Sequence, residues 1–566
     1  MSLLGPPAAS SHEFLNLAHD HVNGAWLGQR RKIVCCALAA KCFFIKFCFA
    51  PIQIDLISVF LIARLIGGSK ASRRRDDGLH SGAPTTRTED ALTQKSVLVW
   101  FRSDLRTSDN PALEAALATG KPVLAIYIHE TDAALRRPGG ASSWWLEKSL
   151  DGLALSLGDI GVPLNLREGQ AGELIAQMVQ EDGVDAVYWN RRYDPAGRAI
   201  DARIKSALRD GDVEAQSFNA ALLVEPWDLL TGQNKPYAVF TPFWNALRKK
   251  PIARPGPAPA ARPARLNRQK SDRSVAFPKW TTKLEPLWEV GERAAQDRLI
   301  LFLDTVGGYD ASRDFPARAA TSQLSPHLRF GEIGPRQVWH GAMAHAHRHP
   351  GCQGAVMKFL SELAWRDFNY HQLFHRDDIS RHPMQPHFAA MAWRRDPGAF
   401  EAWCRGRTGY PIIDAGMREL WQTGYMHNRV RMLAASFLAK NLLLDWRQGE
   451  EWFWDCLVDA DPASNPGNWQ WVSGSGLDAA PWFRIFNPVL QGERFDPAGA
   501  YVHRWVPEIA GLPDEFLHRP FEAPSGVLEA SGVVLGHSYP HPIVNLPASR
   551  RRALDALPRR PAVVKE

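Results

Sequence analysis

The sequence predicts an α/β domain with a doubly wound parallel sheet, followed by an all-helical domain. The chain has 566 residues, more than one domain usually holds, so two folded domains are expected. Between about residues 95 and 225, short apolar runs alternate with helical stretches, the pattern of parallel strands covered by helices. From about residue 285, nearly every segment has helical periodicity, with Gly and Pro at the breaks.

The strands of the first domain are expected at five apolar runs, which begin just after an abrupt change of character at Ser96. They are Val97–Phe101, Pro122–Ile128, Val162–Arg167, Asp185–Asn190 and Val213–Phe218. Helical patterns between them cover Trp144–Leu157, Ala171–Gln180 and Ala196–Asp210. No GxGxxG motif follows a strand, so a nicotinamide dinucleotide site is not predicted.

The remaining segments set the domain boundaries. We expect an N-terminal extension outside the fold (1–94), the α/β domain (95–225), an interdomain linker (226–284), the helical domain (285–514) and a C-terminal tail (515–566). Residues 251–278 are rich in Pro, Ala and Arg and lack periodicity, as linkers do. The apolar block 33–65 is interrupted by Lys41, Lys46, Asp55 and Arg64, so no membrane span is predicted, and a membrane-associating segment is the alternative. A signal peptide is not predicted, because its apolar core would lie nearer the start and precede a small-residue cleavage site.

Composition narrows the function classes. A net charge of +7 and 21 Trp favour a polyanionic partner and stacking surfaces for bases or flavins. Of seven Cys, four lie in the extension, and Cys352, Cys404 and Cys456 are widely spaced. No disulfide framework or metal site is therefore predicted, and a cytoplasmic monomer is expected. His345, His347 and His349 alternate in a polar context typical of a solvated helix end.

A family resemblance rests on several motifs in a fixed order. They are VLVWFRSDLRTSDNPAL (97–113), YAVFTPFWNA (237–246), FPARAATSQLSPHLRFGEI (315–333), FLSELAWRDF (359–368), GRTGYPIIDAGMREL (406–420), YMHNRVRM (425–432) and NWQWVSGSGLDAAPWFRIFNP (468–488). From about Val97 to Pro507 their order and spacing resemble the photolyase/cryptochrome family. The resemblance implies an N-terminal α/β antenna domain and a C-terminal helical domain that binds FAD in a bent conformation.

The resemblance implies an FAD site in the helical domain. Its residues are Tyr309, Thr321, Ser322, Gln323, Leu324, Ser325, Arg431, Asp459, Ala460, Asp461 and Asn465. Residues 321–325 offer hydroxyl and N–H donors at an expected helix start, where anions bind favourably. In the family, Asn465 lies beside flavin N5, and Asn there is typical of repair enzymes, whereas Asp is typical of plant cryptochromes.

Three further sets follow from the same resemblance. The pocket for a cyclobutane pyrimidine dimer comprises Glu362, Trp365, Asn428, Met432 and Trp471. A tryptophan chain that relays electrons to the flavin comprises Trp393, Trp446 and Trp469. Phosphate contacts around the cavity mouth come from Arg313, Arg366, Arg429, Arg484 and Gln491. Arginine suits this task because its guanidinium binds phosphate through two parallel hydrogen bonds.

The resemblance implies light-dependent repair of pyrimidine dimers in UV-damaged DNA, by electron transfer from photoexcited reduced FAD to a flipped-out dimer. A cryptochrome-like photoreceptor is the alternative; a (6-4) photolyase is disfavoured because only His427 occurs around residues 425–432, and a DNA-binding protein without catalysis is disfavoured by intact Glu362 and Asn465. The Asn-Glu pair of one folate-binding subgroup is replaced by Ala196 and Gly197. Four alternatives therefore stay open for the antenna site: a folate such as methenyltetrahydrofolate held differently, a deazaflavin, another flavin, or no chromophore.

Overall fold

The structure is a computed structural model that describes residues 95–261, 277–376 and 378–558. The predicted extension (1–94), the middle of the predicted linker (262–276) and the end of the predicted tail (559–566) lie outside the described residues. Among the described helices, none is long and apolar enough to cross a membrane.

The first domain contains a five-stranded parallel sheet in the order β3-β2-β1-β4-β5. The strands are β1 (Ser96–Phe101), β2 (Val123–Glu130), β3 (Leu164–Gly169), β4 (Val184–Asn190) and β5 (Glu214–Phe218). In the register of the sheet, Val99 of β1 is aligned with Ala125 of β2 on one side and with Tyr188 of β4 on the other. The chain winds outward in both directions from β1 and β4, so the predicted doubly wound sheet is confirmed.

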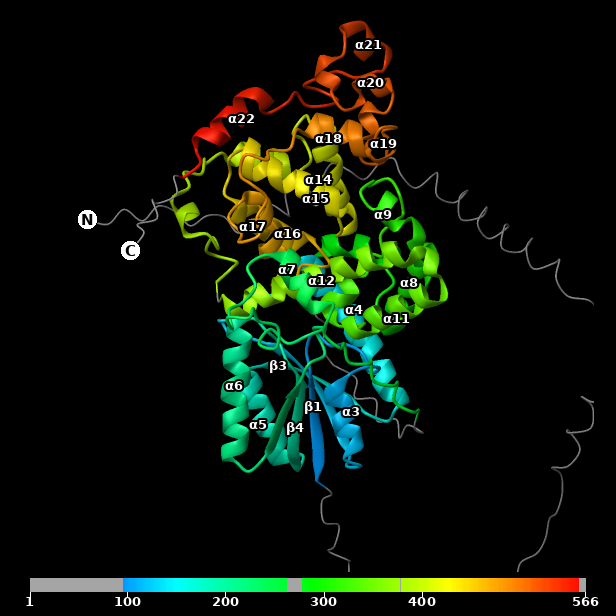
Figure 1. Ribbon diagram of the computed structural model, residues 1–566, viewed down its shortest axis with the longest axis vertical. Coiled ribbons are helices and arrows are strands. Elements are labelled where there is room, and N and C mark those ends of the chain that lie inside the picture. Colours follow the sequence, from blue (N-terminus) through cyan, green and yellow to red (C-terminus); the bar gives the residue numbers. More distant parts are fainter. Residues whose placement is uncertain (1–94, 262–276, 377, 559–566) are drawn as a thin grey trace, which may run out of the picture. The chain divides into compact units, whose positions relative to one another are not determined.

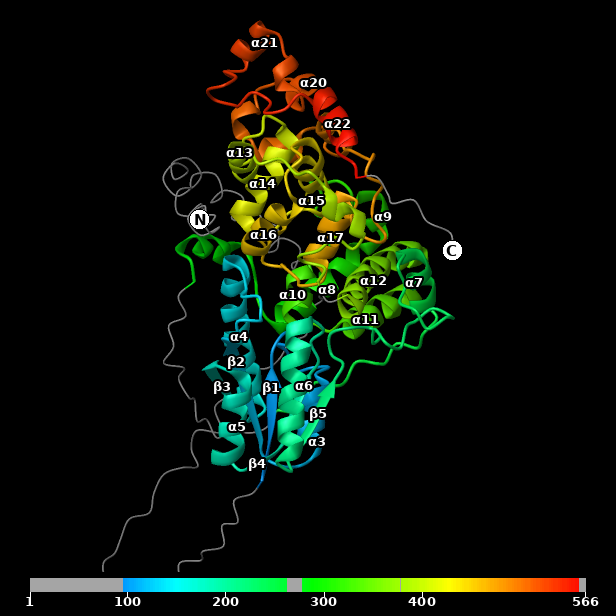
Figure 2. The same ribbon diagram turned by 90° about the vertical axis from the view of Figure 1, so that its left-hand side faces the viewer.

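Helices cover both faces of this sheet. They are α3 (Pro111–Ala118), α4 (Gly140–Asp159), α5 (Ala171–Glu181) and α6 (Pro195–Asp210). Figure 1 shows α5 and α6 on one side of the sheet and α3 on the other, and Figure 2 shows the same arrangement from the side. The sheet is apolar on both faces because Leu98 and Trp100 pack against α5 and α6, while Val97 and Val99 are buried on the opposite face.

The second domain is helical, as predicted. Its principal helices are α7 (Phe240–Leu247), α8 (Glu292–Thr305), α9 (Tyr309–Ser312), α10 (Ser325–Phe330), α11 (Pro335–Arg348), α12 (Gln353–His375), α13 (Pro397–Cys404), α14 (Pro411–Thr423), α15 (Asn428–Ser436), α16 (Trp446–Cys456), α17 (Ser464–Ser473), α18 (Pro488–Phe495), α19 (Ala500–Trp505), α20 (Asp514–Leu517), α21 (Ser525–Ala530) and α22 (Leu546–Asp555). Shorter turns are η1 (Lys279–Leu287), η2 (Val306–Gly308), η3 (Pro350–Cys352), η4 (Pro386–Ala390), η5 (Phe437–Asn441), η6 (Pro507–Ile509) and η7 (Pro520–Glu522).

Side-chain caps fix where the site-bearing helices begin. His427 accepts a hydrogen bond from the backbone N–H of Arg429 at the start of α15. Asp445 does the same for Arg447 at the start of α16. Gly424 and Gly474 end α14 and α17 in the left-handed conformation that glycine adopts without strain. These four residues set the ends of the helices that carry the predicted cofactor and substrate residues.

Residues within the predicted tail pack against the helical domain. The hydroxyl of Tyr539, which is fully buried, donates to Asp414 Oδ2 at 2.6 Å. In α22, the carbonyl of Ala553 accepts a hydrogen bond from Trp482 Nε1 at 2.8 Å, and Ser549 Oγ accepts one from Asn441 Nδ2 at 3.1 Å. The helix α22 therefore supports the segment that carries Trp482.

Polar contacts join the sheet domain to the helical domain. The buried Arg106 donates from Nη1 to the carbonyl of Gly331 at 2.9 Å, and Trp145 Nε1 donates to Glu332 Oε1 at 3.0 Å. Gly331 has φ +68°, and a Cβ there would lie 2.3 Å from the carbonyl oxygen of Ser103. Only glycine permits this close approach of the two backbones.

Candidate functional site

A narrow pocket between α12 and α17 brings the two predicted substrate tryptophans together. Trp365 and Trp471 both line it, with Asn369 and Asp478. The ring of Trp365 stacks on Phe240 with centroids 3.8 Å apart and planes 9° apart. The backbone N–H of Phe240 is held in turn by Asp478 Oδ2 at 2.8 Å. The two indoles thus provide flat walls for a planar apolar group.

The remaining predicted substrate residues lie on two helical faces. Glu362 precedes Trp365 by three positions on α12, so both project from the same face. Asn428 and Met432 share a face of α15, where Asn428 Nδ2 approaches Met432 Sδ at 4.0 Å. All of these side chains are at least partly exposed in an otherwise buried helical core.

Glu362 is surrounded by cations. Its carboxylate forms ion pairs with Arg313 and with Lys358, the latter at 3.2 Å. About a third of the Glu362 side chain is exposed, and one turn along α12 lies Trp365. The oxygens of this partly exposed carboxylate can accept hydrogen bonds from a ligand.

The predicted cofactor residues from two distant stretches meet at Asp459. Arg431 donates to both carboxylate oxygens of Asp459, at 3.0 and 2.8 Å, and Ser325 Oγ donates to Asp459 Oδ2 at 2.6 Å. Arg431 also donates from Nε to the carbonyl of Met426 at 2.7 Å. Burial lowers the pKa of Arg431, but the opposing charge and hydrogen bonds of Asp459 outweigh it and the pKa is raised.

The expected phosphate-binding stretch forms a turn that leads into α10. Gln323 has φ +51°, and its side-chain oxygen accepts a hydrogen bond from Arg298 Nη1 at 2.7 Å. The backbone N–H of Leu324 approaches Ser322 Oγ at 3.4 Å, and the side chain of Thr321 is hydrogen-bonded to Tyr425. Tyr309 is buried against Phe302 and Phe359 rather than open to the turn.

Asp461 supports the start of α17. Its Oδ1 accepts hydrogen bonds from the backbone N–H groups of Ala463 and Ser464 at 2.9 and 2.7 Å, while Tyr370 donates to Oδ2 at 2.8 Å. The carbonyl of the adjacent Ala460 accepts a bond from Arg329 Nε at 2.6 Å. Tyr370 and Arg329 were missed by sequence reasoning, because neither belongs to a local pattern that points to residues 460–461.

Asn465 is held by the preceding helix. Its Nδ2 donates to the backbone carbonyl of Glu450 at 3.0 Å and to Glu450 Oε1 at 2.8 Å. Asn465 is 9% exposed and Glu450 is 2% exposed, so both side chains are shielded from water. Glu450 lies in α16 within a run of charged residues, and nothing in that run indicates that it faces inward.

The predicted tryptophan chain lies on three packed segments. Trp469 and Trp446 are buried and Trp393 is partly exposed. Trp469 of α17 packs so closely on α16 that a Cβ at Gly449 would lie 2.1 Å from its ring. The backbone N–H of Arg394 donates to the carbonyl of Leu443 at 2.8 Å, which puts the segment of Trp393 beside the one that leads into Trp446. Trp393 is therefore the most exposed of the three, and Trp446 and Trp469 are both in the interior.

The predicted phosphate-binding residues differ in exposure: most lie at or near the surface, whereas Arg366 points into the protein. Arg429 pairs with Asp314 at 2.7 Å, next to the Arg313–Glu362 pair, and Arg484 is exposed. Gln491 is partly exposed on α18. Arg366 instead points inward, where it donates to the carbonyl of Ala221 at 2.6 Å. This contact leaves Arg366 13% exposed, in contrast to Arg484.

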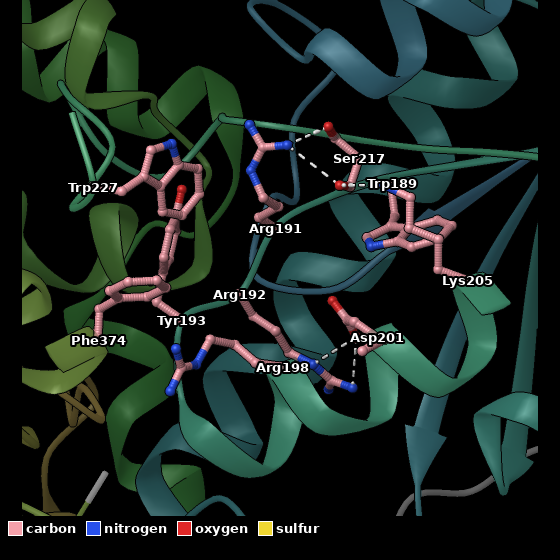
Figure 3. Close-up of a pocket in the computed structure, with 11 residues that line it drawn as sticks. Trp189, Arg191, Arg192, Tyr193, Arg198, Asp201, Lys205, Ser217, Trp227 and Phe374 are labelled. Carbon is pink, nitrogen blue, oxygen red and sulfur yellow. Dashed lines mark hydrogen bonds and ion pairs between the residues drawn. The ribbon is translucent and has the colours of Figure 1, made fainter. Parts of the chain in front are cut away.

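A second pocket lies at the carboxyl ends of β4 and β5, where a doubly wound sheet is expected to bind ligands (Figure 3). Its volume is about 170 Å³, and its lining includes Trp189, Trp227, Phe374, Arg191, Arg198 and Lys205. The guanidinium of Arg198 lies 4.5 Å from the ring centroid of Phe374, and Trp227 lies 5.3 Å from that ring. The pocket therefore combines aromatic walls with positive charge.

Comparison with known proteins covers most of the chain. Residues 97–263 match the family model for DNA photolyase, and residues 359–559 match that for the FAD binding domain of DNA photolyase. The chain is 49% identical to a deoxyribodipyrimidine photo-lyase of Agrobacterium fabrum over 82% of this chain and 98% of the relative. It is 36% identical to Cryptochrome-1 of Arabidopsis thaliana over 81% and 70% of the two chains.

The chain is also similar to solved structures of photolyases. A bacterial class III photolyase from Agrobacterium tumefaciens superimposes with a TM-score of 0.79 at 48% identity, covering 83% of this chain and 98% of the other. An archaeal photolyase from Sulfolobus tokodaii, described with two FAD molecules, superimposes with a TM-score of 0.67 at 30% identity. It covers 81% of this chain and 99% of the other.

Proposed function

This chain belongs to the DNA photolyase family, and on that premise we propose that it repairs cyclobutane pyrimidine dimers in DNA in a light-dependent reaction. The observation that carries the proposal is the shared pocket of Trp365 and Trp471, one helical turn from Glu362. This pocket offers two flat walls to a splayed pair of bases, and the Glu362 carboxylate lies one turn along α12 from Trp365. Stacking of this kind contributes about 1–3 kcal/mol per base.

The polar and charged side chains of the predicted cofactor site suit the chemical groups of FAD. The hydroxyl and backbone N–H groups of residues 321–325 suit a pyrophosphate. The Arg431–Asp459 pair and Asn465 suit the polar edge of the flavin ring. Reduced FAD, when bound, supplies the electron that light transfers to the dimer. The protein's own contribution is to bind, orient and shield the two partners.

The chain's residues divide this work. Photolyases in general extrude the damaged bases from the duplex, at a cost lowered by the weak pairing of a dimer. Trp365 and Trp471 pack against the extruded bases, while Glu362 accepts a hydrogen bond from a base N–H. Arg484 and Arg429 bind phosphates beside the pocket, which positions the duplex without reading its sequence.

The test is blue-light repair of an oligonucleotide that contains one thymine dimer, by the purified and reduced protein, with a dark control. We expect dimers to be lost only in the light. Glu362→Ala and Trp365→Ala are expected to lower repair at least about tenfold, the effect of losing about 1.4 kcal/mol. Trp339→Phe, on α11, is the matched control. Absence of repair in a protein that binds and photoreduces FAD would favour the cryptochrome-like photoreceptor instead.

We further propose that the pocket at the ends of β4 and β5 holds an antenna chromophore. Its aromatic walls suit a flat ring, and Arg198 and Lys205 suit an anionic group, whereas Arg191 is paired with Glu225 at 2.6 Å. A folate such as methenyltetrahydrofolate meets both conditions, with a deazaflavin or a flavin as alternatives. The test is the absorption spectrum of chromophores released from the protein. Trp227→Ala should lose the second chromophore and keep FAD, and equal loss of both would contradict this placement.

We also propose that the protein is a cytoplasmic monomer. Within the described part of the chain the three cysteines are free thiols, which suits a reducing compartment. Light scattering of the purified protein tests the monomer directly. A mass twice that of the chain would contradict it.

A further inference from the structure

Arg136 of the sheet domain reaches a buried carboxylate of the helical domain. It lies between β2 and α4, and its two terminal nitrogens donate to Glu450 Oε1 and Oε2 at 2.7 and 2.8 Å. Its guanidinium also lies 3.9 Å from the ring centroid of Trp454, one turn further along α16. Such a bidentate and stacked contact is specific to arginine, because lysine has no planar group with paired donors.

The segment that carries Arg136 is seated against α16. A Cβ at Gly139 would lie 2.1 Å from the carbonyl oxygen of Trp454, so the backbones touch there. The N–H of Gly140 donates to Asp455 Oδ1 at 2.8 Å, and Trp454 Nε1 donates to the carbonyl of Arg137 at 2.9 Å. Arg136 is therefore held in place by several contacts besides its own ion pair.

Glu450 bonds to both Arg136 and Asn465, and so connects the two residues. The same Oε1 that accepts from Arg136 also accepts from Asn465 Nδ2 at 2.8 Å. An ionised carboxylate can only accept hydrogen bonds, so it fixes the amide with its NH2 group toward α16 and its oxygen on the other side. The backbone carbonyl of Glu450 holds the amide the same way round, because it accepts from Asn465 Nδ2 at 3.0 Å. A neutral carboxyl has an O–H that can donate to the amide oxygen, so it would oppose this orientation where the carboxylate supports it.

We propose that Arg136 is a positioning residue for Asn465 that acts through Glu450, so that the sheet domain decides which end of this amide faces the flavin. The inference rests on the proposed function, in which Asn465 lies beside flavin N5. Glu450 is 2% exposed, and Arg136 supplies the positive charge that compensates this buried carboxylate. With Arg136 in place, the amide oxygen stays available to accept a hydrogen bond from an N5–H group.

The test measures how fast the photoreduced protein returns to its oxidised flavin spectrum in air. We expect Arg136→Gln to return about tenfold faster, the size expected for one charge-assisted hydrogen bond. Glu450→Gln should act in the same direction, and Arg136→Lys should restore part of the effect. Lys148→Gln is the matched control, because it removes another ion pair between the domains, at 2.8 Å to Glu285, that does not reach Asn465.

A double-mutant cycle separates positioning from a merely structural role. In an Asn465→Ala background, Arg136→Gln should have no further effect on the return rate, whereas a loosened domain contact would still accelerate it. An unchanged rate in Arg136→Gln, with FAD content and thermal unfolding like those of Lys148→Gln, would overturn the inference. If Arg136→Gln fails to fold, Glu450→Gln carries the same test, since it keeps the size of the side chain.

These outcomes are distinguishable from failure of the proposed function. The return rate needs bound FAD but no repair, so a protein that repairs nothing can still show the effect of Arg136→Gln. Conversely, a repair-competent protein whose return rate ignores Arg136 and Glu450 would contradict this inference alone.

Discussion

Asp459 is the residue on which the candidate cofactor site converges. It accepts from Arg431 twice and from Ser325 once, and it is 7% exposed. We expect Asp459→Asn to lose most bound FAD and on the order of 3 kcal/mol of stability, because it breaks a largely buried ion pair. The flavin-to-protein absorbance ratio and urea unfolding measure the two effects. Asp297→Asn, which removes an exposed pair with Arg293, should change neither; equal effects of both substitutions would contradict the prediction.

His427 makes the stability of the folded protein depend on pH. Burial lowers its pKa from 6.5 to about 4, so the folded protein keeps it neutral while its Nδ1 caps α15. Above pH 6.5 the residue is neutral in both states and has no effect. As the pH falls toward about 4, only the unfolded chain gains the proton, and stability falls by about 3 kcal/mol.

The variant His427→Asn isolates this contribution, because Asn also caps helices but does not titrate. We expect similar urea midpoints for the two proteins at neutral pH, and a smaller loss of stability on acidification in the variant. His371, whose pKa is lowered to about 3 chiefly by burial, is present in both proteins and cancels in the comparison. Parallel pH curves would show that His427 is not kept neutral by the fold.

For single residues, the sequence indicates which residue types a site contains, but not where their side chains point. Residues 321–325 and 459–465 remain predictions that rest on contiguous motifs, and Ser325 Oγ donates to Asp459 Oδ2 at 2.6 Å. Arg366 was predicted to bind phosphate, yet it donates to the carbonyl of Ala221, which only the folded chain brings near. Arg136 and Glu450 lie 314 positions apart in the sequence, so no local pattern could relate them.

Among the elements, α22 supports the segment that carries Arg484. Trp482 Nε1 donates to Ala553 of α22 at 2.8 Å, and Lys440 Nζ donates to the carbonyl of Arg484 at 3.0 Å. We expect Trp482→Phe to lower stability by about 1 kcal/mol through the lost hydrogen bond and to weaken DNA binding. Urea unfolding and fluorescence anisotropy with labelled DNA measure this. Trp505→Phe, in α19, is the control; unchanged DNA affinity in Trp482→Phe would mean that the segment needs no support from α22.

The elements of the sheet domain were the most predictable. All five predicted strands are present with ends within two residues, because buried parallel strands are continuous apolar runs bounded by polar residues. Short helices were less predictable, since a single turn or two gains its stability from packing rather than from propensity. Thus α7 lies within the predicted linker, where Phe240 and Phe243 join the helical core, and α22 lies within the predicted tail.

For the described molecule as a whole, the polar contacts between sheet and helical domains determine how it unfolds. Glu292 of α8 accepts hydrogen bonds from the backbone N–H groups of Thr107 and Ser108, at 2.7 and 2.9 Å, and Arg106 donates to Gly331 at 2.9 Å. Polar interfaces between domains ordinarily permit relative motion. Here the interface buries Arg106 and Trp145 completely or nearly so, and separating the domains would expose both.

We therefore expect one cooperative calorimetric transition for the two domains, and two transitions in Glu292→Ala. The substitution leaves two backbone N–H groups and the Thr107 hydroxyl without their acceptor, at a cost of about 1–3 kcal/mol confined to the interface. Glu289→Ala, an exposed neighbour, should keep the single transition. Two transitions in the parent protein would show that the domains unfold independently, and Arg136 could then act on Asn465 only while the two are docked.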